Sequence, residues 1–133
     1  MKDVKTYGLS HLAIAVSDLD RTLTFYKNVF DVEVMYQTKV FLQVTTPGAN
    51  DIIVFEKKEA PYGQTGGIAH FGFRLKRPDD IDEMAVRITK AGGKIIDKGE
   101  FVPGEPYIFF TDPDGYEVEV WYELVAGAGG QPA

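Results

Sequence analysis

Apolar and polar residues alternate near the amino terminus, which indicates a β-strand over residues 9–16. One face of this strand carries large apolar residues and the other carries a histidine with two alanines, namely Leu12, Ile14 and Val16 against His11, Ala13 and Ala15. Apolar residues then recur at helical spacing, at Leu19, Leu23, Tyr26 and Phe30, with Ser17 as the expected N-cap. Three further strands are predicted in segments 31–37, 39–46 and 50–58.

The same order of elements recurs in the second half. The segment GIAHFGFRL, residues 67–75, again sets bulky apolar residues against a histidine and a small residue, with His70 and Gly72 sharing one face. A helix is predicted up to Gly92-Gly93, followed by strands within 94–101, 106–112 and 116–124. We therefore expect a single domain over residues 1–133, built from modules 7–58 and 67–124, with a linker at 59–66 and a flexible tail at 125–133.

Composition excludes several classes of function. The net charge of −6 and the pI near 4.8 argue against a nucleic-acid partner, since such binding depends on Lys and Arg. The absence of cysteine excludes disulfides and thiolate metal sites. No apolar run reaches membrane-spanning length, so we expect no membrane partner and a cytoplasmic location.

The two histidines, the only ones in the chain, occupy equivalent positions of the repeat beside small residues. Small neighbours leave room in front of each imidazole, which suggests a cavity on the histidine face. A divalent metal would need a further ligand, and the last strand offers carboxylates at Glu117 and Glu119, on the face opposite Val118 and Val120. Spacing alone does not choose between these two glutamates.

Three segments together resemble the vicinal oxygen chelate superfamily, which includes glyoxalase I, fosfomycin-resistance proteins, extradiol dioxygenases and bleomycin-resistance proteins. They are GLSHLAIAVSDLDRTLTFYKNVF, GIAHFGFRL and YIFFTDPDGYEVEVWYE. The resemblance implies an α+β fold in which two β-α-β-β-β modules form a curled, eight-stranded mixed sheet around a metal cleft. It assigns His11, His70 and Glu119 as metal ligands. One departure is that the usual Leu-Gly after the first helix reads Phe30-Asp31.

The resemblance also implies the chemistry. Two imidazoles and one carboxylate leave positions open on a divalent ion (Mn, Fe, Co, Ni or Zn), which acts as a Lewis acid toward adjacent oxygens. The expected function is a lyase, isomerase or transferase acting on a small vicinal-oxygen substrate, in a homodimer. The alternative is a metal-free protein that sequesters a ligand, as in the bleomycin-resistance branch.

The proton-transfer group is less clear. Glyoxalase I and related epimerases use a glutamate on the last strand of the first half, and the internal alignment places Val54 at that position, equivalent to Glu119. Glu56, one strand step further along the same face, is a weak candidate base if the register shifts by two residues, and otherwise a solvated strand end before Lys57 and Lys58. Residues that could line the pocket, or else form ordinary sheet core, are Tyr36, Phe41, Gln43, Tyr107, Phe109 and Trp121. Lys98, before the seventh strand, could reach an anionic substrate or else be simply exposed.

Overall fold

The computed structural model describes residues 2–124. The chain divides into two compact units, residues 1–60 and 61–133, and the boundary falls within the linker predicted at 59–66. The flexible tail predicted at 125–133 lies outside the described residues. No helix within residues 2–124 is long and apolar enough to span a membrane.

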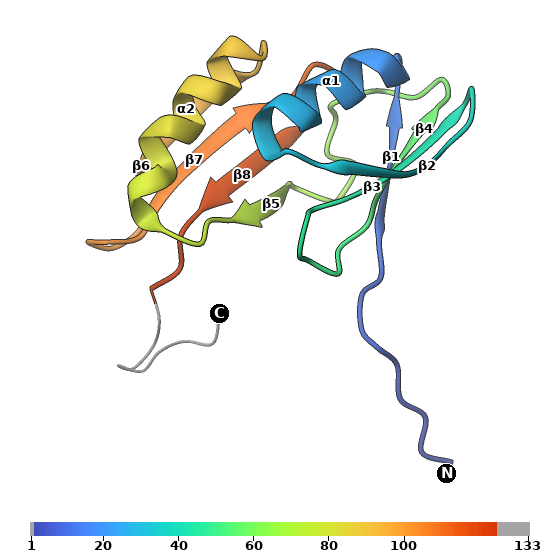
Figure 1. Ribbon diagram of the computed structural model, residues 1–133, viewed down its shortest axis with the longest axis horizontal. Coiled ribbons are helices and arrows are strands. Elements are labelled where there is room, and N and C mark those ends of the chain that lie inside the picture. The colour runs from blue at the N-terminus through green and yellow to red at the C-terminus, as the bar shows by residue number, and fades with distance from the viewer. Residues whose placement is uncertain (1, 125–133) are drawn as a thin grey trace. The chain divides into compact units, whose positions relative to one another are not determined.

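The first unit contains one helix and one four-stranded sheet (Figure 1). Its elements are β1 (Leu12–Val16), α1 (Leu19–Phe30), β2 (Glu33–Gln37), β3 (Phe41–Thr45) and β4 (Ile53–Lys57). The strand order is β1-β4-β3-β2, with β1 parallel to β4 and the other neighbours antiparallel. The first and last strands of the unit are therefore hydrogen-bonded neighbours.

The second unit has the same order and the same strand directions. Its elements are β5 (Phe71–Arg74), a 3₁₀ turn (Pro78–Asp80) leading into α2 (Ile81–Lys90), β6 (Lys94–Glu100), β7 (Pro106–Thr111) and β8 (Glu117–Trp121). The strand order is β5-β8-β7-β6, with β5 parallel to β8. The predicted repeat of β-α-β-β-β is confirmed, and its eight strands divide between two four-stranded sheets.

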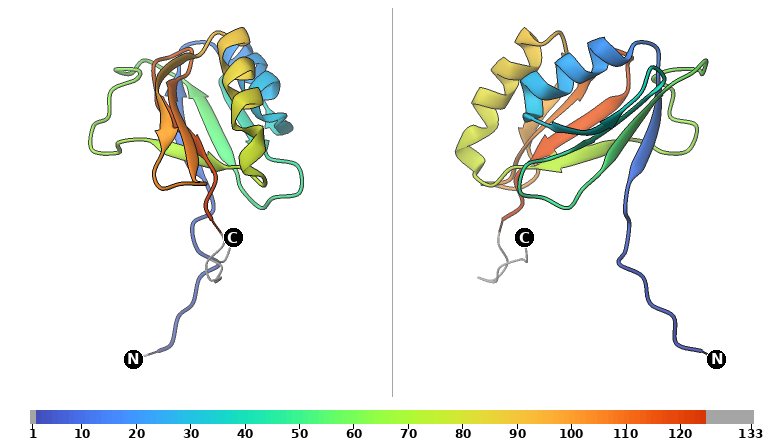
Figure 2. Two further views of the ribbon diagram at one scale, coloured as in Figure 1. Left: turned by 90° about the vertical axis from the view of Figure 1, so that its left-hand side faces the viewer. Right: turned by 45° about the vertical axis from the view of Figure 1, so that its right-hand side comes forward.

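The core of each unit lies between its helix and one face of its sheet. In the first unit, Phe55 of β4 is fully buried and its ring centroid lies 5.0 Å from that of Tyr26 on α1. In the second unit, α2 runs along one face of the sheet (Figures 1 and 2), where Ile88 is buried together with Val118 and Val120 of β8. Strand alternation then directs the other set of side chains, which includes both predicted histidine faces, away from the helices.

The ends of α1 differ in detail from the prediction. The N-cap is Asp18 rather than Ser17, because the Asp18 carboxylate accepts a hydrogen bond from the Arg21 amide at 3.0 Å. At the other end, Asp31 adopts a left-handed conformation with φ 57° and donates its N–H to the Lys27 carbonyl at 2.9 Å. This position favours glycine, which explains why the family's Leu-Gly pattern places one there.

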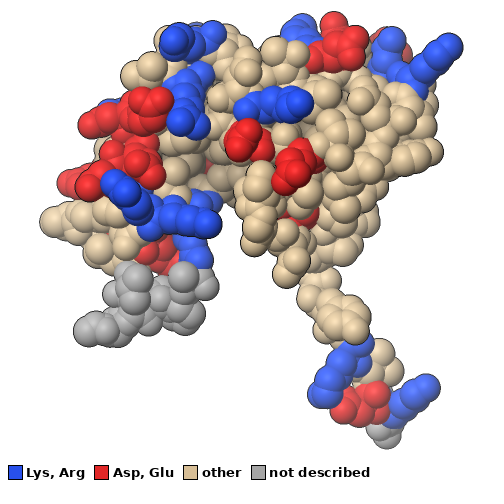
Figure 3. All heavy atoms as spheres, viewed as in Figure 1, with Lys and Arg blue, Asp and Glu red and all other residues tan. Residues whose placement is uncertain are grey.

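The strand predicted from residue 9 begins at Leu12 in the structure. The segment before it is exposed and forms no part of the sheet. Figure 3 shows acidic and basic side chains together near its end, where the Lys5 ammonium lies 3.3 Å from the Asp3 carboxylate. His11 is consequently the last residue before the strand, at the point where the chain enters the sheet.

Candidate functional site

The first unit contains a cavity of about 290 Å³ beside His11. It is lined by His11, Ala13, Phe41, Gln43, Ile52, Val54 and Glu56. The cavity predicted from the small residues next to this histidine is therefore present. The Ser10 hydroxyl lies 2.7 Å from Nδ1 of His11, which leaves Nε2 available as a ligand or proton carrier. Tyr36, another predicted pocket residue, has its ring centroid 5.9 Å from that of Phe41 and is exposed.

Strand register supports the internal alignment of the two halves. Ala13 of β1 is the cross-strand partner of Val54, as Gly72 of β5 is the partner of Glu119. Since Ala13 and Gly72 each lie two residues after a histidine, Val54 and Glu119 occupy equivalent rungs of their sheets. The predicted equivalence is confirmed, and the first unit has an apolar residue where the second has a carboxylate.

Glu56 is the titratable carboxyl that lines the first unit's cavity. Its partners on the neighbouring strands are Ala15 and Phe41, so it lies one rung beyond Val54 on the same face. The Lys58 ammonium is 3.5 Å from its carboxylate, and the Glu56 side chain is 39% exposed. It is thus placed at the rim of the cavity, in contact with solvent.

In the second unit, His70 lies just before β5 and faces two carboxylates of β8. Its Nε2 is 3.4 Å from Oε1 of Glu119, and its Nδ1 is 4.0 Å from Oε2 of Glu117. The Glu119 side chain is only 12% exposed, whereas that of Glu117 is 39% exposed. The Phe109 ring stands edge-on to the imidazole at 5.1 Å. Of the two glutamates that spacing left open, Glu119 is the closer to His70 and the more buried.

The surroundings of Glu119 suit a cation. Burial raises the pKa of its carboxyl above the ordinary value, while the charge of His70 and its hydrogen bond act in the opposite direction and Glu117 raises the pKa further. A carboxylate that loses hydration on burial is stabilised by a nearby positive charge. Imidazole nitrogen and carboxylate oxygen together are donors that divalent transition metals accept, so this pair fits the predicted ion.

Gly72 provides the space that Glu119 occupies. A methyl group at Gly72 would lie 3.0 Å from the Glu119 carbonyl oxygen and 3.3 Å from its Cβ. These contacts are tighter than ordinary van der Waals contact, and one of them is with the backbone of β8. The glycine predicted merely as a small neighbour of His70 therefore sets how closely β5 and β8 approach at the carboxylate.

We expect Gly72→Ala to lower metal affinity about tenfold, because the added methyl displaces the Glu119 strand from the His70 ring. The fold should survive, since such overpacking costs about 1–3 kcal/mol in the free energy of unfolding. Isothermal titration with Mn²⁺ or Zn²⁺ measures the effect, and Ala13→Gly on the equivalent rung of the first unit is the matched control. Unchanged affinity in Gly72→Ala would show that this contact does not position the ligand.

The DPDG turn, residues 112–115, determines how β8 pairs with β7. The Asp112 carboxylate accepts hydrogen bonds from the amides of Asp114 and Tyr116, both at 3.0 Å, and Gly115 takes φ +91°. Behind the turn, Gly63 approaches so closely that a Cβ there would meet the Asp114 carbonyl at 2.8 Å. The turn fixes the register in which Phe109 is the partner of Glu119.

The remaining predicted pocket residues of the second unit separate into two groups. Tyr107, Phe109 and Trp121 share the face of Glu119, through the pairs Tyr107–Trp121 and Phe109–Glu119. Lys98 instead pairs with Ile108, whose side chain is buried on the helix face, and its ammonium lies 2.7 Å from the Asp82 carboxylate of α2. This corrects the expectation for Lys98, which points away from the pocket residues.

Each unit therefore carries part of the predicted ligand set, His11 in the first and His70 with Glu119 in the second. Among residues 2–124, no group of three or more His, Asp or Glu side chains is assembled as a metal site. Three residues near Tyr107 were missed by sequence reasoning, namely Asp97, Gly99 and Phe101. A glycine directly across from an aromatic residue on the next strand was the signal that could have found them.

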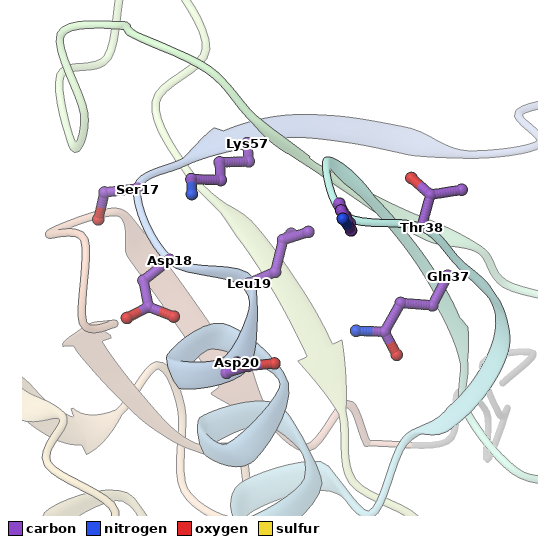
Figure 4. Close-up of a pocket in the computed structure, with 8 residues that line it drawn as sticks. Ser17, Asp18, Leu19, Asp20, Gln37, Thr38 and Lys57 are labelled. Atoms are coloured by element: carbon purple, nitrogen blue, oxygen red, sulfur yellow. The ribbon is translucent and has the colours of Figure 1, made fainter.

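A second, wider hollow of about 760 Å³ lies at the start of α1 in the first unit (Figure 4). Its walls are polar and include Asp18, Asp20, Lys39 and Lys57. Asp18 is used there to cap the helix. None of the predicted site residues lines this hollow.

Comparison with known proteins identifies the family. The sequence profile of the Glyoxalase/Bleomycin resistance protein/Dioxygenase superfamily matches residues 8–120, which is most of the chain. The chain belongs to this superfamily. The match spans both histidines and Glu119, and the resemblance inferred from the sequence is confirmed.

Members of this superfamily with several activities are similar to the chain. A metallothiol transferase FosB of Lysinibacillus sphaericus is 26% identical, with 84% of this chain and 79% of the relative covered. A lactoylglutathione lyase of Schizosaccharomyces pombe is 29% identical over 98% of this chain, which spans only 51% of that protein. The fosfomycin resistance protein FosX of Listeria monocytogenes has a similar structure, with a TM-score of 0.76, 25% identity, and 90% and 96% of the two chains covered.

Proposed function

We propose that this protein is a divalent-metal-dependent enzyme of the superfamily, acting on a small substrate with adjacent oxygens, and that His11, His70 and Glu119 are the metal ligands. The observation that carries the proposal is the His70–Glu119 pair, 3.4 Å apart with a largely buried carboxylate. The equivalent position of His11 on the first unit's sheet supports its role as the third ligand. A FosX structure from Listeria monocytogenes contains Mn(II), so a related protein accepts such an ion.

The bound ion would supply Lewis-acid polarisation of substrate oxygens. Residues of the chain would line the substrate pocket, orient the substrate and transfer protons. Phe41, Ile52 and Val54 give the first unit's cavity an apolar lining that limits access of water, and the Gln43 amide offers it a hydrogen-bonding group. Glu56, at the rim, would accept and return a substrate proton as a carboxylate.

Val54 bears on which reaction is catalysed. In the superfamily's isomerases we expected a carboxylate at this rung, and the first unit presents an isopropyl group instead. Proton transfer from Val54 is impossible, so it has to come from Glu56 or from the substrate's own groups. Val54 therefore disfavours the proton-transfer route of glyoxalase I and the epimerases and favours a transferase, in which no second carboxylate at this rung is required. A homodimer and a cytoplasmic location stay predictions.

The test is the metal content of the purified protein, together with titration of chelator-treated protein with Mn²⁺, Co²⁺, Ni²⁺ and Zn²⁺. We expect stoichiometric binding of at least one of these ions, and loss of that binding in both His11→Ala and His70→Ala. Lys98→Ala, on the opposite face of the second unit's sheet, is the control and should bind as the native protein does.

Two outcomes would contradict the proposal. If the native protein contains no metal, iron included, as purified and binds none of the four ions, the protein is not a metalloenzyme, and the metal-free, ligand-sequestering alternative is supported. If only His70→Ala loses the ion, His11 is not a ligand. Circular dichroism of each variant separates loss of a ligand from loss of the fold.

A further inference from the structure

Four aromatic side chains form a cluster on the Glu119 face of the second unit's sheet. The cluster, called the aromatic platform below, consists of Phe101, Tyr107, Phe109 and Trp121. The Phe101 and Tyr107 rings stack with centroids 4.2 Å apart and planes 19° apart. Phe101 also contacts Trp121 edge-on at 6.1 Å, and Tyr107 contacts Phe109 at 5.6 Å. Phe109 in turn contacts His70, so the platform extends up to the proposed ligands.

The central ring of the platform is held in a defined position. A Cβ at Gly99 would lie 3.1 Å from the Tyr107 hydroxyl oxygen and 3.3 Å from Cζ, so the Tyr107 ring lies directly over this glycine. The Tyr107 hydroxyl donates a hydrogen bond to the Asp97 carboxylate at 3.1 Å, which also raises the pKa of the phenol. Phe101 is 49% exposed, so the stacked pair is accessible at the edge of the sheet. A rigid, accessible aromatic surface is a platform for stacking.

Charges around the platform disfavour an anion. Three carboxylates lie on this face, those of Asp97, Glu117 and Glu119. Across the strands, Asp97 pairs with Phe109, Glu117 pairs with Thr111, and Glu119 pairs with both Phe109 and Gly72. Among the strand residues described for this unit, two cations share the face. The Arg74 guanidinium is engaged by the Glu123 carboxylate at 2.9 Å, and Lys94 pairs with Thr111, at the end of the sheet away from Trp121.

We infer that the aromatic platform binds a planar, conjugated group of the substrate that carries no negative charge, adjacent to His70 and Glu119. The inference deepens the proposed function, on which it rests for the location of the site. Stacking on the fixed Tyr107 and Phe101 rings supplies the affinity, and repulsion by the Asp97 and Glu117 carboxylates, which are not proposed ligands, rejects anions. The platform thereby selects among substrates by their ring and charge.

Trp121 makes the inference directly testable, because it is the only tryptophan in the chain. Benzamide, benzamidine and benzoate have the same ring but are neutral, cationic and anionic at pH 7. Each is titrated into chelator-treated, full-length protein while Trp121 fluorescence is followed. We expect saturable changes with benzamide and benzamidine, and binding of benzoate at least about tenfold weaker, which corresponds to about 1.4 kcal/mol of repulsion.

Variants identify the site of binding. Phe101→Ala and Tyr107→Ala should each weaken benzamide binding about fivefold, because each removes one of the two rings that form the stacking surface. Tyr107→Phe retains the ring and should bind almost as the native protein does. Lys98→Ala, on the other face of the same sheet, should be unchanged.

Three results would overturn the inference. They are the absence of saturable binding for every probe, benzoate binding as tightly as benzamide, and benzamide binding that is unaffected by both Phe101→Ala and Tyr107→Ala in folded protein. Because the titrations are done without metal, they are independent of the proposed metal site. If the protein binds benzamide but no metal ion, the inference about the platform stands and the proposed metalloenzyme function fails. If it binds a metal ion but no benzamide, the proposed function stands and the inference fails.

Discussion

Glu119→Gln is expected to lower the affinity for divalent metal at least about 100-fold, because it replaces the carboxylate that faces His70, the proposed oxygen ligand, with a neutral amide. The substitution preserves the size of the side chain, so the packing against Gly72 and the pairing with Phe109 should persist. Isothermal titration with the ion that the native protein prefers measures the change, and circular dichroism checks the fold.

Glu117→Gln is the matched control for this prediction. It makes the same chemical change two residues earlier on the same face, at a side chain that is more exposed and lies 4.0 Å from His70. Its effect on metal affinity should be less than about tenfold. Equal losses in the two variants would mean that the negative charge of the face, rather than Glu119 as a ligand, holds the ion.

Phe55→Ala is expected to lower the free energy of unfolding by about 3–5 kcal/mol. Phe55 of β4 is fully buried on the helix-facing side of the first unit's sheet, with its ring centroid 5.0 Å from that of Tyr26 on α1. Removing the ring eliminates its buried apolar area and leaves a cavity that β4 and α1 cannot close completely. Since typical domains have about 5–15 kcal/mol of stability, urea denaturation should show a large shift of the midpoint.

Phe41→Ala provides the comparison. Phe41 lies on the neighbouring strand but faces the cavity beside His11, and it is only half-buried. Its replacement should cost clearly less stability than that of Phe55, because less apolar surface becomes exposed. If the two variants were equally destabilised, the helix-facing side of this sheet would not be the main core of the unit.

Periodicity alone predicted the order of the elements and, for β1 and β8, which face of the strand is buried. Alternation separated Val118 and Val120, both fully buried, from Glu117 and Glu119 on the other face, and this division is observed. The reason is that one face of each sheet has to bury its side chains against a helix. The burial pattern of a strand can therefore be predicted from the residues of that strand alone.

Features that depend on non-local geometry were harder to predict. Lys98 was expected near the pocket, but β6 contains a bulge between Ile95 and Asp97 that shifts the phase of its side chains, and an alternating pattern does not show a bulge. The preference for Glu119 over Glu117 came from the family resemblance, because spacing within one strand does not report the distance to His70. Similarly, Gly99 is only recognisable as part of a site once Tyr107 lies across it.

The parallel pairing of first and last strands in each unit has a consequence for the history of the site. A module duplicated without change would carry the same residue on both equivalent rungs, giving either two carboxylates or two apolar side chains. The present chain has Val54 on one and Glu119 on the other. The chemical asymmetry of the protein thus arose after duplication, and a single amino-acid replacement on an unchanged backbone frame is enough to create or erase it.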